Sequence, residues 1–166
     1  LHVRQQVIRE IRNWNADIVL GLRPNDYHPD HRYAGVLVQD AAYLVVVPNV
    51  TPDTPPLTKN PVFLYMEDGF QKPNPFSPDI VVGIDDVVDT KVAGLDAHES
   101  QMYEWLPWVS GTLDQVPEDK ELRKEMVKRG YVERRSISPE KRRALEKWYG
   151  KEKGSKFKYA ESFEIC

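Results

Sequence analysis

The chain has 166 residues and a mass of 19.2 kDa, a size that suits one domain over residues 1–166. Its net charge of −3 disfavours a protein that binds nucleic acid through the phosphates, and no apolar run approaches the ~20 residues that a membrane-spanning helix needs. The single cysteine, Cys166, excludes an internal disulfide and a multi-cysteine zinc site; the cytoplasm is favoured, although export is not excluded.

The first part of the chain predicts a helix, a strand and a second helix. Apolar residues repeat on one helical face across residues 1–14 and predict a helix there. The continuous apolar run at residues 18–20 is typical of a strand buried on both faces. A polar loop, residues 23–31, follows at the carboxyl end of that strand. We expect the second helix to begin near Pro29 and to be stopped by Pro48.

Prolines mark the middle of the chain. Eight of the thirteen lie between Pro48 and Pro78, so this stretch predicts loops interrupted by one strand at residues 62–65. Such a region can form the rim of a site or a rigid surface connection, and the sequence leaves both open. A second buried-strand pattern follows at residues 79–84.

Helical patterns dominate the rest of the chain. We expect one helix at about residues 89–103 and two charged helices at about 118–129 and 138–150, the last with Ser138 as its cap. Helices that alternate with buried strands in this way predict a layered α/β domain with a mainly parallel sheet. Ligands bind such folds beyond the carboxyl ends of the strands, where the loop at 23–31 lies.

The segment His28-Pro29-Asp30-His31 concentrates groups that can carry chemistry. Two histidines three residues apart can reach one cleft when the second lies in the first turn of a helix. Neutral imidazole is a good zinc ligand, and the carboxylate between them could orient one ring. The alternative is a pair of ordinary surface histidines. Their position at the carboxyl end of a strand strengthens the case for metal binding or catalysis.

Three further groups admit a functional and a structural interpretation. Residues 91–101, with His98 and Gln101, could contribute to a site or form the polar face of an amphipathic helix. Asp85-Asp86 could bind a cation or mark the start of a helix. An aromatic group could stack on a sugar ring or form the edge of a core: Tyr103, Trp105 and Trp108. The structural interpretation is the commoner one in each case.

Residues 23–32, Arg-Pro-Asn-Asp-Tyr-His-Pro-Asp-His-Arg, closely resemble the second signature of the PIG-L/LmbE-like zinc-dependent N-deacetylases. Residues 14–20 resemble the helix-to-strand entry of that family, and residues 91–101 resemble its later K…A…H-x-S-Q helix. Residues 160–164, Ala-Glu-Ser-Phe-Glu, resemble its A-E-x-F-E stretch. The resemblance implies a Rossmann-like three-layer α/β/α sandwich with a mainly parallel sheet, here without its N-terminal strands.

The resemblance also implies a reaction. Members hydrolyse the acetamide of an N-acetylated amino sugar or related glycoside, and zinc activates a water and polarises the amide carbonyl. His31 would be a zinc ligand, and His28 would stabilise the oxyanion and protonate the leaving amine. Asp30 would hydrogen-bond His28 and hold it in the charged form. Substrate contacts are implied for five residues: Arg23, Asp26 and Tyr27 beside the histidines, and His98 and Gln101 at the pocket rim.

The sequence departs from the family at one point. The first family signature, A-H-P-D-D, supplies two further zinc ligands and the general base, and it is absent from these residues. The other histidines are His2 and His98, and neither precedes Pro-Asp-Asp. Because one protein ligand does not hold a catalytic zinc, we expect the carboxyl-terminal part of a larger deacetylase domain. A missing N-terminal segment or a second chain would complete it, and a homo-oligomer is possible.

Two other functions remain open. One is a non-catalytic carbohydrate-binding or assembly module that keeps the fold and the cleft without a complete metal site; an A-H-P-D-D strand upstream of Leu1 would argue against it. The other is a different metallohydrolase that combines His28 and His31 with Asp85 or Asp86. The spacing of these residues in the sequence does not favour it. A short homologue that has lost its activity is a third explanation for the missing A-H-P-D-D signature.

Overall fold

A computed structural model describes residues 1–133 and 137–166 of the chain. The chain divides into two compact units, one of residues 1–80 with 162–166 and one of residues 81–161. The second unit is therefore inserted in the sequence of the first. This division does not by itself separate one domain from two, so the single domain expected from chain length stays a prediction.

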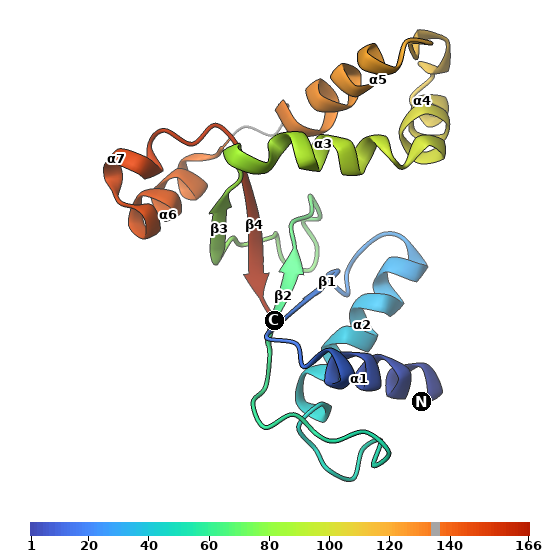
Figure 1. Cartoon of the computed structure of the whole chain (residues 1–166), viewed down its shortest axis with the longest axis vertical. Helices are drawn as coiled ribbons and strands as arrows, with labels where there is room; N and C mark the ends of the chain where they lie inside the picture. Colours follow the sequence, from blue (N-terminus) through green and yellow to red (C-terminus); the bar gives the residue numbers. More distant parts are fainter. Residues whose placement is uncertain (134–136) are drawn as a thin grey trace. The chain divides into compact units, whose positions relative to one another are not determined.

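The first unit follows the predicted order of helix, strand, helix and strand. Its elements are α1 (His2–Trp14), β1 (Ile18–Gly21), α2 (Pro29–Leu44), β2 (Val62–Met66) and most of β4 (Ala160–Ile165) (Figure 1). The second helix begins at Pro29 and runs through Leu44, as the pattern predicts, and turns lead from there to Pro48. The prolines after it keep residues 48–61 out of regular structure, as their density predicts.

The sheet is mostly antiparallel, so the mainly parallel sheet expected from the sequence is wrong. Its strand order is β1-β2-β4-β3, with β3 at Ile80–Gly83. β1 and β2 are parallel, with Ile18 opposite Val62. β4 runs antiparallel to β2. The amide of Asp79 donates to Phe163 and the amide of Ile84 donates to Tyr159, a descending register that makes β3 antiparallel to β4 as well.

The core of the first unit lies on one face of β1 and β2. Helices α1 and α2 pack side by side there and bury Ile8, Ile11, Ala41 and Val45 against Phe63 of β2 (Figure 1). The opposite face is only partly covered: Leu64 of β2 is buried on it, but its neighbours are exposed. Ile18 and Leu20 of β1 and Val62 and Met66 of β2 lie on it, and Ile18 is 59% exposed. The apolar run at 18–20 was expected to be buried on both faces, and in this chain it is not.

A buried arginine holds the irregular segment after α2. The guanidinium of Arg12 donates hydrogen bonds to the last residue of α2, through the carbonyl of Leu44, and to the segment itself. Its acceptors there are the carbonyls of Val45, Val47, Val50, Thr51 and Thr54 and the hydroxyl of Thr51. Arg12 is 4% exposed, and its burial lowers the pKa of the guanidinium. The loop thus obtains through one side chain the hydrogen bonds that a regular element would supply itself.

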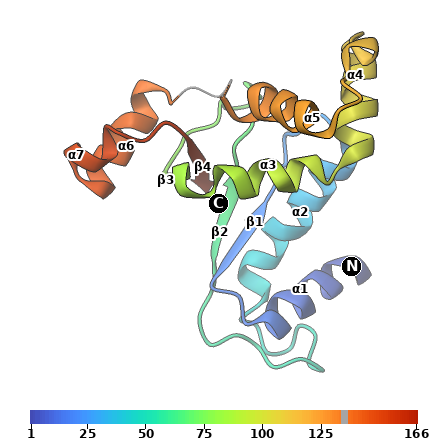
Figure 2. The same cartoon turned by 45° about the horizontal axis from the view of Figure 1, so that its top comes forward.

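The second unit is mainly helical. It contains α3 (Val88–Asp96), α4 (Leu106–Val109), α5 (Lys120–Val127), α6 (Pro139–Tyr149) and α7 (Lys151–Gly154), with π-helical turns at Ser100–Trp105 and Lys128–Glu133. α3 and α5 lie side by side (Figure 2). The helix predicted at 89–103 is interrupted after Asp96, and α6 begins at the predicted cap Ser138. Tyr103 and Val127 belong to one buried cluster of this unit.

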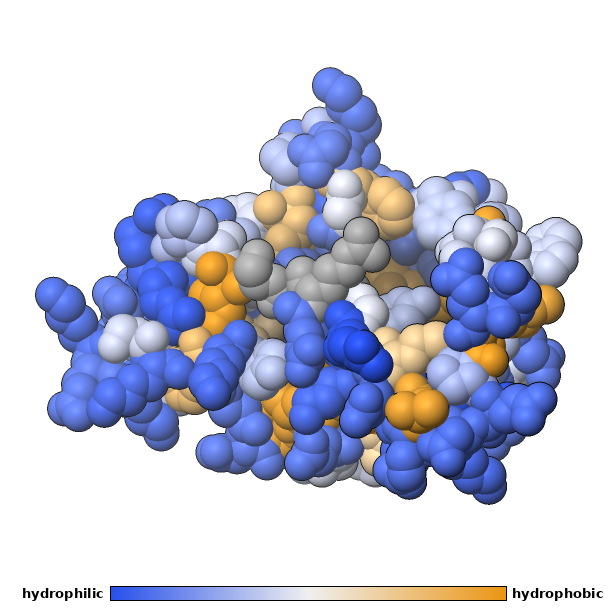
Figure 3. Space-filling view, turned by 90° about the horizontal axis from the view of Figure 1, so that it is seen from above, coloured by the Kyte–Doolittle hydropathy of each residue, from blue (hydrophilic) through white to orange (hydrophobic). Residues whose placement is uncertain are grey.

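The surface is largely polar. Figure 3 shows charged and polar side chains over most of the face that it draws, with apolar residues in patches between them. Within residues 1–133 and 137–166, no helix combines the length and the apolar character needed to cross a membrane.

Candidate functional site

The loop between β1 and α2 carries the predicted site, and it lies at the carboxyl end of β1. His28 is the N-cap of α2, and Pro29 occupies the first turn, where its missing amide costs nothing. The Nδ1 atom of His28 accepts a hydrogen bond of 3.2 Å from the backbone amide of Asp30. The residues that start α2 are therefore also residues of the site, and the cap fixes the backbone positions of both histidines.

Asp26 is the carboxylate that organises this loop. It is 7% exposed, and its Oδ1 atom accepts a hydrogen bond of 2.9 Å from the backbone amide of His28. The same oxygen lies 3.2 Å from Nδ1 of His31. Because an ionised carboxylate only accepts, the hydrogen of the His31 ring belongs on Nδ1. That tautomer leaves the lone pair of Nε2 free, which is the arrangement of a histidine prepared to bind a metal.

The two histidine rings lie close together. Their centroids are 4.7 Å apart at an interplanar angle of 35°, and both side chains are nearly half exposed. Tyr27 makes edge contacts with both rings, at 5.9 Å from His28 and 6.0 Å from His31, and it also contacts Phe70. The structure thus brings His28, His31 and Tyr27 to one accessible point, where a ligand could touch all three.

Asp30 has a different environment from the one implied by the family resemblance. Its side chain is 89% exposed, and its Oδ2 atom lies 3.9 Å from Nδ1 of His28. That ring nitrogen already accepts a hydrogen bond from the Asp30 amide, so the hydrogen of His28 belongs on Nε2 and the ring is neutral in this arrangement. A charged His28 paired with Asp30 requires this cap bond to break.

Arg23, for which the family resemblance implies a substrate contact, is buried and paired with acids. It donates to Asp68 at 2.9 Å and to the carbonyl of Asn74 at 2.7 Å, and its Nε atom lies 3.6 Å from Glu164. These partners follow β2 in the chain or lie in β4, so Arg23 ties three segments together at the edge of the loop. Sequence reasoning named Arg23 but missed Asp68 and Glu164.

Gly35 is a further residue that sequence reasoning missed. A Cβ atom at this position would lie 2.3 Å from the carbonyl oxygen of Leu22, in the backbone that leads into the site loop. Only glycine therefore lets α2 approach that backbone so closely. Arg32, one turn earlier, donates to the carbonyls of Asp26 and Tyr27 at 3.0 and 2.7 Å. The loop is thus held from the helix side as well.

The other predicted residues lie in the second unit, where the structure favours structural interpretations for several of them. His98 and Gln101 are exposed. The carboxylate of Asp85 accepts hydrogen bonds from the backbone amides of Lys158 and Tyr159, which gives it a structural use. Lys91 forms an ion pair with Glu161. This contact joins two of the segments that resemble the deacetylase family, residues 91–101 and residues 160–164.

The three aromatic residues singled out in the second unit, Tyr103, Trp105 and Trp108, differ in burial. Tyr103 is buried and donates to Asp96 at 2.6 Å; burial and this hydrogen bond raise the pKa of its hydroxyl. Trp105 and Trp108 are exposed and stack on each other, with ring centroids 5.5 Å apart. Tyr103 therefore serves the core, as the structural interpretation expected, whereas the tryptophans lie on the surface.

The described residues alone do not form a metal centre. Within them, no three side chains of His, Cys, Asp or Glu are grouped so that they could hold a metal ion. His31 offers one free ring nitrogen, and Asp26 is already used to orient it. A zinc site that includes His31 therefore needs ligands from outside the part of the chain that the structure describes.

Comparison with solved structures identifies the class of fold. The chain is similar to N,N'-diacetylchitobiose deacetylase from Pyrococcus horikoshii (19% identity, 99% of this chain and 51% of that chain, TM-score 0.55). It is also similar to GalB, the 4-carboxy-2-hydroxymuconate hydratase from Pseudomonas putida KT2440 (19% identity, 98% and 57%, TM-score 0.58). A third similar structure is the conserved protein TT1542 from Thermus thermophilus (22% identity, 98% and 57%, TM-score 0.50).

These likenesses show a mixed α/β fold with an open four-stranded sheet, of the kind that a deacetylase and a hydratase share. At such identities they show the fold alone, and one fold serves different reactions. No protein-family model matches the sequence. The chain spans a little over half the length of each of these structures.

Proposed function

We propose that this chain is part of a zinc-dependent hydrolase that removes the acetyl group from the nitrogen of an N-acetylated amino sugar or glycoside. The observation that carries the proposal is the Asp26–His31 contact, which leaves Nε2 of His31 free beside His28. The fold shared with a chitobiose deacetylase supports the reaction class, and the resemblance of residues 23–32 to a deacetylase signature supports its chemistry.

Each residue of the loop has a distinct part in this proposal. His31 contributes one metal ligand through Nε2, and Asp26 keeps that nitrogen unprotonated. Zinc, when bound, would polarise the amide carbonyl and activate a water. His28 donates from Nε2 to the carbonyl oxygen as negative charge develops there, and when protonated it delivers a proton to the leaving amine. Asp30 accepts from His28 in that charged state, and Tyr27 contacts the substrate.

The remaining zinc ligands come, in this proposal, from a polypeptide segment outside these 166 residues, either on the same polypeptide or on a second chain. Two observations support such a segment. The chain spans about half of each similar structure. The face of β1 and β2 opposite α1 and α2 also exposes large apolar side chains, and it lies next to the site loop. A segment packed on this face would lie close to His31.

A non-catalytic sugar-binding module is the second candidate. It is favoured by the absence, within the described residues, of a group of three metal-binding side chains. It predicts that no zinc binds even when all parts of the protein are present, and that an N-acetylated sugar binds without being hydrolysed.

The decisive experiment is elemental analysis and an acetate-release assay with N,N'-diacetylchitobiose on the complete protein, meaning this chain with any segment that completes it. We expect His31→Ala to remove zinc and activity together. His28→Ala should keep zinc and lower kcat by about 10²-fold or more, the usual scale for a lost general acid or oxyanion donor.

His2→Ala is the matched control, because His2 is an exposed histidine at the start of α1 with no place in the proposed site. Zinc that stays at wild-type content in His31→Ala would refute the ligand assignment. A wild-type protein without zinc that binds the sugar unchanged would favour the binding module instead.

A further inference from the structure

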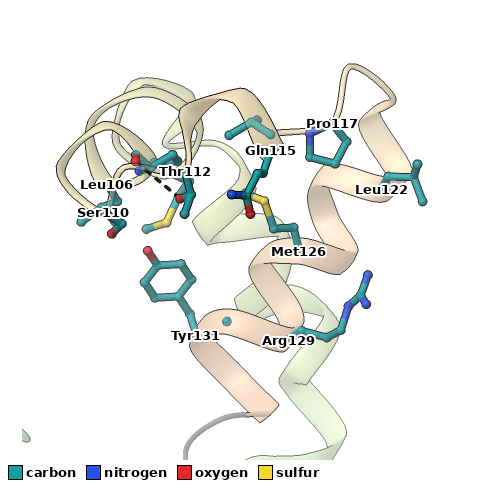
Figure 4. Close-up of a pocket in the computed structure, with 13 residues that line it drawn as sticks. Leu106, Ser110, Thr112, Gln115, Pro117, Leu122, Met126, Arg129 and Tyr131 are labelled. Carbon is teal, nitrogen blue, oxygen red and sulfur yellow. Dashed lines mark hydrogen bonds between the residues drawn. The ribbon is translucent and has the colours of Figure 1, made fainter.

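The second unit contains a cavity that the proposed deacetylase site does not use. Its volume is about 580 Å³, and it lies between the turn that follows α4 and the helix α5 (Figure 4). All of its lining residues fall between Met102 and Tyr131, within one compact unit. A volume of several hundred Å³ is typical of sites for small organic molecules.

Most of the cavity wall is apolar. Met102, Leu106, Val116 and Met126 line it, with Pro107 and Pro117 at its borders. Two of these residues are methionines, whose unbranched side chains adapt to ligands of different shape. The wall can therefore accept a flexible apolar body such as an alkyl chain.

Three uncharged polar side chains face the same space. The hydroxyl groups of Ser110 and Tyr131 and the amide of Gln115 line the cavity, and none of them makes a side-chain hydrogen bond within residues 1–133 and 137–166. Ser110 and Gln115 are exposed to solvent, and Tyr131 is partly buried. Figure 4 shows the hydroxyl of Tyr131 pointing toward Ser110 and Thr112, with the amide of Gln115 on the same side of α5. Such free donors and acceptors at one end of an apolar cavity can fix the orientation of a ligand.

The cavity offers no free charge. Arg129 is the charged residue among those that line it, and its guanidinium lies 3.5 Å from the carboxylate of Glu125. In Figure 4 this guanidinium points away from Tyr131. A charged ligand group placed among Ser110, Gln115 and Tyr131 would find no unpaired counter-charge among the lining residues, so these uncharged groups favour a neutral ligand end.

We propose that this cavity binds a neutral amphiphile. Its alkyl or aryl part packs against Leu106, Val116 and Met126, and its hydroxyl or amide end exchanges hydrogen bonds with Ser110, Gln115 and Tyr131. This binding site belongs to the second unit by itself and does not depend on zinc, on the loop at His28, or on deacetylation. Its test can therefore fail while the proposed deacetylase function stands, and the reverse also holds.

The test is isothermal titration calorimetry of the full 166-residue chain with n-octyl β-D-glucoside below its micelle-forming concentration. Two comparison probes separate the parts of the proposal: methyl β-D-glucoside keeps the neutral head without the tail, and octanoate keeps the tail with a charged head. We expect saturable binding of octyl glucoside and binding at least about tenfold weaker for each of the other two.

Variants place the binding in this cavity. Tyr131→Phe removes one hydroxyl and should weaken the affinity for octyl glucoside about threefold to tenfold, the range of one hydrogen bond. Tyr149 belongs to the same unit but lies outside this cavity, so Tyr149→Phe should leave the affinity unchanged. Met126→Trp and Leu106→Trp each fill the cavity and should abolish binding while the far-UV circular dichroism stays that of the wild type. Absence of saturable binding, equal binding of octanoate, or wild-type affinity in both folded tryptophan variants would overturn the proposal.

Discussion

One oxygen atom of Asp26 determines both the shape of the site loop and the tautomer of His31. It accepts a hydrogen bond from the backbone amide of His28 and also lies within hydrogen-bond distance of Nδ1 of His31, and the Asp26 side chain is buried. A buried carboxylate oxygen that holds two groups at once is costly to replace, because both partners lose their acceptor. At the residue scale, the site therefore depends on a side chain that touches no reacting atom.

The first prediction concerns Asp26→Asn in the complete protein. An amide can accept one hydrogen bond but no longer supplies a charged acceptor, so Nδ1 of His31 loses its preference for the hydrogen. We expect zinc affinity to fall about 10- to 100-fold, the usual effect of losing a carboxylate behind a metal-binding histidine. Competition with a chromophoric chelator measures it. Asp17→Asn, at an exposed carboxylate, is the control, and equal affinities in the two variants would contradict the role of Asp26.

The sequence predicted part of this site. His28 and His31 are recognisable because their spacing and their place after a strand are local properties of the chain. The substrate contact implied for Asp26 stays a prediction. Its link to His31 was not foreseen, because that link depends on how the loop between the two residues turns, and no local pattern specifies that turn. The acid partners of Arg23 were missed for another reason: Asp68 and Glu164 come from segments far away in the sequence.

At the scale of elements, Arg12 connects α1 to the irregular segment that follows α2. The guanidinium donates from inside the unit to five carbonyls of this segment and to the carbonyl of Leu44 at the end of α2. Nearby, the exposed pair of Arg9 and Asp53 makes a second link, and the hydrogen bond from Arg9 lowers the pKa of Asp53. The first link is buried and the second is solvated, so they should differ greatly in strength.

The second prediction is that Arg12→Lys lowers the free energy of unfolding by about 3–5 kcal/mol, the usual cost of breaking a buried charged network. A lysine ammonium has three donors on one atom and cannot reach carbonyls on both sides as the planar guanidinium does. Urea denaturation followed by circular dichroism measures the change. Arg9→Gln, in the exposed pair, should change stability far less, and a comparable loss in both variants would refute the special role of Arg12.

The sequence predicted the elements of the fold better than their arrangement. Strands at 62–65 and 79–84 and the cap at Ser138 were expected and are present, because apolar runs and capping residues are local signals. Strand direction is not a local signal. The strand at Ala160–Ile165 carries two glutamates and a serine, so it lacked the apolar run that marked the others, and its insertion between β2 and β3 makes both of those pairings antiparallel.

At the scale of the whole molecule, the main feature to explain is the face of β1 and β2 opposite α1 and α2, which exposes large apolar side chains. β1 is an edge strand, so one row of its backbone groups has no strand beside it within the described residues. Ile18, Leu20 and Val62 are exposed on the adjoining face. An edge strand with an apolar face is suited to receive further strands or helices, which agrees with the proposal that another segment completes the zinc site.

The third prediction compares Leu20→Glu in two contexts. In the 166-residue chain the change should alter the free energy of unfolding by less than about 0.5 kcal/mol, because Leu20 is already exposed. In the complete protein it should cost at least about 2 kcal/mol, because the charge would be buried under the added segment. Urea denaturation of both proteins measures the difference, with Tyr33→Glu, on the exposed side of α2, as control. Equal small effects in both contexts would mean that the face remains open.

The position of β4 also has a consequence for the order of folding. β2 is synthesised long before its antiparallel partner, since all of the second unit except Ala160 and Glu161 of β4 lies between them in the sequence. The second unit has its own hydrophobic clusters and can begin to pack as it leaves the ribosome. β2 must wait until residues 160–165 have been translated, and during that interval its edge is open to wrong partners. The nascent chain thus assembles its inserted part before the sheet that carries the histidines is closed.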